Sequence, residues 1–279
     1  MPTGLSLHIG LNSVDPAHYQ GWSGPLTACE ADAQDMLAIA ASRGFTPQSL
    51  FTPAATRQNV TSEMSSAANR LNSGDIFLLY YSGHGGQLPD LNGDEVHQQD
   101  ETWCLYDGQL VDDEIYALLG RFRAGVRILV FSDSCHSGTT IKMAYYYGSN
   151  RSPALTFDRP SSTSYRAMPN DIARRVYQAN KATYDPILQD TTLDGSRSCV
   201  AASATLISGC QDNQLSSDGA FNGLFTGTML RVWSDGAFTG NYRDFHAAIV
   251  QRMPPDQTPN YFTVGSSNAA FESQTPFTI

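Results

Sequence analysis

Two apolar segments constrain the fold of this chain most strongly. A strand with one face in water alternates apolar and polar residues, and neither segment does. The first spans residues 75–81 and the second residues 127–131. Strands of this kind are typical of parallel sheets in which helices cover both faces. We therefore expect both segments to be strands that are buried on both faces of such a sheet.

Helical patterns alternate with these strands. Apolar residues recur at a spacing of three to four from Leu26 to Ser42, which predicts an amphipathic helix. Further helices are predicted at 56–71, 111–123, 171–182, 221–233 and 242–253, and further strands at 5–11, 49–52, 199–207 and 261–264. The alternation predicts an α/β fold with a mostly parallel central sheet and helices on both faces, in three layers.

The length of 279 residues permits one domain or two. Neither half of the chain supplies enough strands for a sheet of its own, so we predict a single domain over residues 1–279. Residues 139–198, rich in Ser, Tyr, Arg and Pro, interrupt the pattern and are interpreted as an insertion. It separates a larger part, about 1–138, from a smaller part, about 199–279.

Charge and composition exclude some partners. The formal net charge of −10 disfavours nucleic acid, since a phosphate-binding surface needs clustered Lys and Arg. No run approaches the roughly 20 apolar residues of a membrane-spanning helix, and the first residues do not resemble a signal peptide. Five cysteines at irregular spacing are a poor disulfide framework. We expect a cytoplasmic protein that binds neither nucleic acid nor membrane and is a monomer rather than a dimer.

Each of the two apolar strands ends in a loop that carries a potential catalytic group. His84 follows the first strand among Gly83, Gly85 and Gly86, and Cys135 follows the second. In α/β sheets, sites assemble at the carboxyl ends of strands. A histidine base can convert a cysteine thiol into the reactive thiolate. Either residue alone is usually structural, and only their joint placement indicates catalysis.

The two loops resemble the catalytic blocks of metacaspases, which have the caspase fold. Residues 81–86 read Tyr-Ser-Gly-His-Gly-Gly and residues 133–138 read Asp-Ser-Cys-His-Ser-Gly. His84 precedes Cys135 by 51 residues, close to the ~50 of caspases. A third block at 207–214 is similar to a segment of the metacaspase small-subunit-like part. The resemblance implies a caspase-like sheet and a cysteine endopeptidase.

The resemblance also implies roles for individual residues. Cys135 would attack the scissile carbonyl, with His84 as base and then as acid. The backbone N–H groups of Gly85 and Cys135 would stabilise the oxyanion. Metacaspases cleave after Arg or Lys, and the positions that match their acidic pocket are Asp32, Ser82 and Asp133. Protein or peptide substrates with a basic residue before the scissile bond are therefore expected.

Many metacaspases are activated by calcium through four aspartates. Asp100, Asp112 and Asp113 match three of these positions, but Lys142 stands at the fourth. A cation there removes a ligand and repels the metal, so we expect no required cofactor and a calcium effect that is weak or absent.

Two other functions remain open on this sequence: a catalytically silent caspase-fold protein that binds partners, and an enzyme that uses the same dyad on a non-peptide substrate. The insertion adds a further expectation, because an enzyme that cuts after basic residues carries candidate sites there. Self-cleavage is predicted at Arg174, Arg175 or Arg166; the alternative is an ordered insertion that packs over the sheet and is never cut.

Overall fold

The computed structural model describes residues 1–93, 98–135, 165–194, 200–210 and 216–279. In these residues the main sheet has six strands in the order β2-β1-β3-β7-β8-β9. Their bounds are β1 Gly4–Gly10, β2 Thr46–Phe51, β3 Ile76–Ser82, β7 Arg127–Asp133, β8 Ser203–Ser208 and β9 Asn260–Gly265. The first five pair in parallel, and β9 runs antiparallel to β8. The two apolar segments, now β3 and β7, are neighbours at the centre of this sheet.

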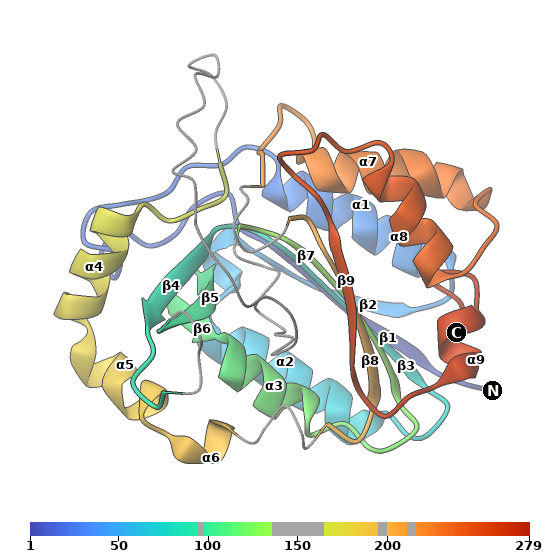
Figure 1. The fold of residues 1–279 in the computed structure, drawn as a ribbon, viewed down its shortest axis with the longest axis horizontal. Coiled ribbons are helices and arrows are strands. Elements are labelled where there is room, and N and C mark those ends of the chain that lie inside the picture. Colours follow the sequence, from blue (N-terminus) through green and yellow to red (C-terminus); the bar gives the residue numbers. More distant parts are fainter. Residues whose placement is uncertain (94–97, 136–164, 195–199, 211–215) are drawn as a thin grey trace, which may run out of the picture.

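Helices cover both faces of this sheet (Figure 1). One layer contains α1 Cys29–Ser42, α7 Leu224–Trp233 and α8 Tyr242–Val250, and the opposite layer contains α2 Arg57–Arg70 and α3 Asp112–Leu119. Side chains of β3 alternate between the layers: Leu78 and Tyr80 pack with the first, Phe77 and Leu79 with the second. The three-layer α/β prediction is confirmed, and the apolar continuity of β3 is explained by burial on both sides.

The polar stretch after His84 contains two strands that the sequence patterns did not predict. It contains β4 Gly85–Pro89 and β5 Gln99–Leu105, which form a small antiparallel sheet with β6 Gly108–Val111. These strands are short and carry polar residues, so local composition gave no strand signal. The small sheet helps to position His84, because β4 begins at Gly85, the next residue along the chain.

The described part of the insertion holds more helix than predicted. Instead of one helix at 171–182, it contains α4 Asn170–Ala179, α5 Lys181–Leu188 and α6 Thr191–Asp194. Val176 and Tyr184 from this part are fully buried and pack in a third apolar cluster with Leu88 of β4. Residues 170–188 are thus anchored against the small sheet. Residues 165–168, which precede them, lie at the loops that follow β3 and β7.

Shorter elements complete the described chain. They are the 3-10 turns Thr52–Ala54 and Ser234–Gly236 and the C-terminal helix α9 Ala269–Ser273. None of the helices in the described residues is both long and apolar enough to cross a membrane.

Candidate active site

The sheet places the two predicted catalytic loops side by side. β3 and β7 pair so that Ser82 lies opposite Asp133, and the loops that carry His84 and Cys135 leave the sheet together. Gly85 lies so close to the Cys135 backbone carbonyl that a Cβ atom at this position would overlap it. A glycine is therefore required where the two loops meet.

A segment of the chain itself, residues 165–168, crosses this site in extended form. The carbonyl oxygen of Arg166 accepts two hydrogen bonds, from the backbone N–H of Gly85 at 2.9 Å and from that of Cys135 at 3.1 Å. The Arg166 N–H donates to the carbonyl of Ser216 at 3.0 Å, and the Met168 N–H donates to the carbonyl of Gly85 at 2.8 Å. The segment is thus held on both sides of the Arg166–Ala167 peptide bond.

His84 is oriented by backbone and aromatic contacts. Its Nε2 lies 2.9 Å from the carbonyl oxygen of Gly24, and the Trp22 ring lies 4.7 Å from the imidazole, centroid to centroid. The Tyr81 hydroxyl donates to the His84 carbonyl at 2.7 Å and fixes the loop. A carbonyl only accepts, so Nε2 carries the proton and the neutral ring keeps its lone pair on Nδ1. This Nδ1 is buried and has no hydrogen-bond partner among the described residues.

Burial keeps both groups of the pair uncharged. Cys135 is only 1% exposed, and burial raises the pKa of its thiol to about 12, although the Ser216 N–H donates to Sγ at 3.0 Å. Burial likewise lowers the pKa of His84 to about 4. In the covered site the resting pair is therefore a thiol and a neutral imidazole.

The side chain of Arg166 enters an acidic pocket beside the two loops. Its guanidinium forms ion pairs with three carboxylates: Nη2 with Asp32 at 2.7 Å and Asp218 at 3.0 Å, and Nη1 with Asp133 at 2.8 Å. Nη1 also donates to the Ser82 hydroxyl at 2.9 Å. The structure thus brings together all three predicted pocket residues. Sequence reasoning missed Asp218, which belongs to no motif that we could identify.

Neutral donors offset the burial of these carboxylates. Asp133 accepts hydrogen bonds from the hydroxyls of Ser216 and Thr226, both at 2.6 Å. Burial raises the pKa of Asp32 to about 6, although the guanidinium opposes this shift. Burial also acts on Asp218, but hydrogen bonds from Thr27 and the charge of Arg166 hold its pKa below the ordinary value.

The calcium candidates lie outside this cluster of contacts. Asp100 is in β5, Asp112 and Asp113 are in the first turn of α3, and all three are buried. Within the part of the chain that the structure describes, no three His, Cys, Asp or Glu side chains are grouped so that they could hold a metal ion. Lys142 lies outside the described residues. Whether calcium affects this protein stays a prediction.

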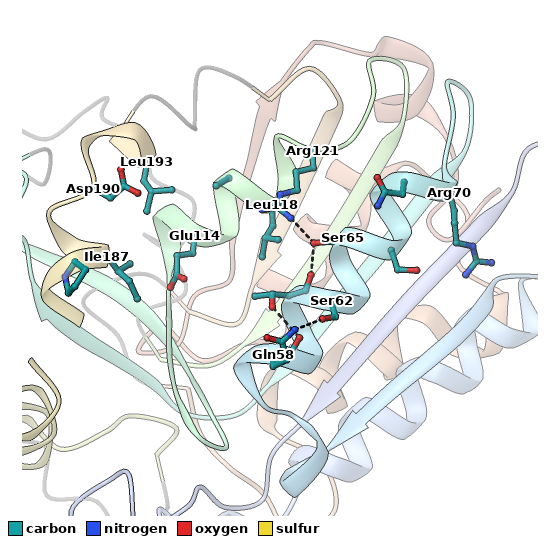
Figure 2. A pocket seen from close by; sticks show the side chains of 15 residues that line it. Gln58, Ser62, Ser65, Arg70, Glu114, Leu118, Arg121, Ile187, Asp190 and Leu193 are labelled. Carbon is teal, nitrogen blue, oxygen red and sulfur yellow. Dashed lines mark hydrogen bonds between the residues drawn. The ribbon is translucent and has the colours of Figure 1, made fainter. Parts of the chain in front are cut away.

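A separate cavity of about 840 Å³ lies between α2, α3 and the α5–α6 region (Figure 2). Its wall includes Ser62, Ser65, Glu114 and Arg121, and the Arg121 guanidinium donates to the Ser65 hydroxyl at 2.8 Å. None of the predicted site residues lines it. The chemistry argued from the sequence therefore belongs to the strand ends and not to this cavity.

Comparison with known proteins agrees with this geometry. Residues 14–276 match the model of the Peptidase C14 family, the caspase domain. The chain belongs to this family. Metacaspase-1 of Mycosarcoma maydis is 29% identical over 245 residues, which cover 80% of this chain and 59% of the relative. Metacaspase-1 of Schizosaccharomyces pombe is 31% identical over 189 residues, 62% of this chain and 44% of the relative. This caspase-domain chain is thus metacaspase-like and spans about half the length of these relatives.

Solved structures support the same fold. Protein GSU0716 from Geobacter sulfurreducens is 57% identical, covers 99% of both chains and has a TM-score of 0.84. Caspase-1 from Spodoptera frugiperda is 9% identical, with a TM-score of 0.55 over 95% of this chain and 86% of its own, which shows a shared fold. The predicted caspase-like architecture is therefore confirmed, and the chain is a member of a cysteine-peptidase family.

Proposed function

We propose that this protein is a cysteine endopeptidase that cleaves peptide bonds after Arg or Lys, with Cys135 as nucleophile and His84 as general base. One observation carries the proposal: the backbone and side chain of Arg166 are bound as those of a substrate would be. Its carbonyl oxygen accepts from two backbone N–H groups, and its guanidinium lies among carboxylates. Donors that converge on one carbonyl oxygen are suited to stabilise the oxyanion that develops there.

The chemistry follows from the tautomer of His84. With Nε2–H donating to the Gly24 carbonyl, Nδ1 accepts the thiol proton of Cys135 as the sulfur attacks the scissile carbonyl. The oxyanion is held by the N–H groups of Gly85 and Cys135. Collapse breaks the C–N bond, and Nδ1–H protonates the leaving amine. Water, deprotonated by the same imidazole, then hydrolyses the thioester.

The preference for a basic residue follows from the charge of the pocket. Asp32 and Asp133 lie within ion-pair distance of a buried cation, and such a cation compensates carboxylates that are otherwise costly to bury. An Asp before the scissile bond would face like charges in a poorly hydrated pocket. We therefore expect turnover of Arg and Lys peptides and none of Asp peptides.

We also propose that the chain cleaves itself between Arg166 and Ala167. The other two candidate sites, Arg174 and Arg175, are exposed residues of helix α4. A helix cannot offer the backbone pairing that Arg166 makes with Ser216, because its own N–H and C=O groups are already bonded. Cleavage at either of them would require α4 to unwind first.

The test compares wild type with Cys135→Ala on fluorogenic peptides that differ only in Arg, Lys or Asp before the scissile bond. Intact-mass measurement of the same two proteins detects cleavage after Arg166. We expect hydrolysis of the basic peptides and a cut chain for wild type only. A folded wild-type protein without either activity would refute the proposal and favour a partner-binding caspase-fold module.

A further inference from the structure

Asp218 is a pocket carboxylate that comes from a third part of the chain. Asp32 belongs to α1 and Asp133 ends β7, whereas Asp218 lies in the loop between β8 and α7. Its Oδ1 contacts Arg166 Nη2 at 3.0 Å, and its Oδ2 accepts the backbone N–H and the hydroxyl of Thr27 at 2.8 and 2.9 Å. Because both oxygens are engaged, the carboxylate is fixed in position. The side chain of Asp218 is also only 3% exposed.

The contacts of the pocket are divided between the two ends of the guanidinium. Nη1 bonds to Asp133 and Ser82, and Nη2 bonds to Asp32 and Asp218. The buried Nε of Arg166 has no hydrogen-bond partner among the described residues. The pocket therefore recognises the outer fork of the side chain, which is the part that lysine lacks.

We propose that Asp218 is a specificity-determining residue that makes this pocket select arginine over lysine; the inference rests on the proposed function. In the same extended conformation, a lysine ammonium occupies the place of the guanidinium carbon, one bond short of both Nη positions. It can move toward the Asp133 side or toward the Asp32–Asp218 side, but not toward both. A lysine substrate thus leaves one side of the pocket as a poorly compensated, desolvated charge.

The kinetic test measures kcat/KM for matched Arg and Lys peptides on wild type and Asp218→Asn. The asparagine keeps an oxygen that can accept from Thr27 and removes the charge. We expect wild type to prefer Arg at least about 10-fold, and Asp218→Asn to lose roughly 10- to 100-fold on Arg but less than about 3-fold on Lys. Asp35→Asn is the matched control, because Asp35 bonds to Asn222 at 2.8 Å and does not pair with Arg166. Its Arg-to-Lys ratio should stay at the wild-type value.

A second readout needs no catalysis. In the Cys135→Ala protein, Arg166→Lys should lower the melting temperature when Asp218 is present and much less when Asp218→Asn is also introduced. Equal turnover of Arg and Lys by wild type, an unchanged ratio in Asp218→Asn, or additive melting shifts would each overturn the role of Asp218. A wild-type protein that turns over neither peptide would overturn the proposed function instead, and the melting cycle would still decide the selectivity.

Discussion

Gly223 forms the wall of the acidic pocket, and adding one methyl group there should block arginine. A Cβ atom at Gly223 would lie 2.5 Å from Nη2 of Arg166 and 2.6 Å from both Cζ and Nη1. The backbone angles of Gly223, φ −57° and ψ 154°, are open to alanine. Gly223→Ala should therefore fold normally and alter only the room available to the guanidinium.

The size of the effect follows from these distances. To restore ordinary contact at 3.4 Å, the guanidinium must withdraw by up to about 0.9 Å. The ion pair of 2.7 Å to Asp32 would then exceed hydrogen-bond distance, and so would that of 3.0 Å to Asp218. Two hydrogen bonds to charged groups, each contributing about 1.5 kcal/mol or more, amount to roughly a 100-fold loss in kcat/KM for an Arg peptide.

The assay combines peptide kinetics, intact mass and thermal melting. Gly223→Ala should show the 100-fold loss and little cutting after Arg166. It should still melt in one cooperative transition, but at a lower temperature than wild type, because the same two ion pairs hold Arg166 in the folded chain. Gly227→Ala, inside the helix α7 that Gly223 precedes, is the control, since a Cβ there meets its nearest neighbour, Asn222 Cβ, at an ordinary 3.4 Å. Wild-type kcat/KM for Arg peptides in a well-folded Gly223→Ala protein would refute the assignment of this pocket.

Three further predictions concern the catalytic pair, the pH dependence of the pocket and calcium. Cys135→Ala and His84→Ala should each reduce peptide cleavage by at least about 1000-fold, since a catalytic pair works as a unit; substantial activity of either pure variant, with circular dichroism as the control for folding, would contradict the dyad. Burial raises the pKa of Asp32 to about 6, so its charge is present above this pH and lost below it. The KM for Arg peptides should accordingly rise as the pH falls through about 6, and Asp32→Asn should remove this dependence. Calcium or a chelator should change the cleavage rate less than about 3-fold, and an obligatory calcium requirement in a titration would show that the metal prediction is wrong.

The sequence predicted the layered fold because the signal is local. Continuous apolar residues in β3 and β7 require burial on both faces, and helical periodicity supplied the covering layers. Adjacent parallel strands bring their carboxyl ends together, so the proximity of His84 and Cys135 could be expected from the same pattern. The small sheet of β4, β5 and β6 was missed because short polar strands are stabilised by their pairing partners and not by their own composition.

Only some residues of the acidic pocket could be predicted from the sequence. Asp32 and Asp133 could be named because they adjoin residues that match a family pattern, but Asp218 and Gly223 adjoin none. Only the tertiary structure decided that Asp218 faces the same guanidinium, because the pocket is assembled from α1, β7 and the loop before α7, which are distant along the chain. It also decided which arginine of the insertion lies there. Local sequence records which charges a chain carries, whereas the packing of distant elements determines which of them are buried together and must be compensated.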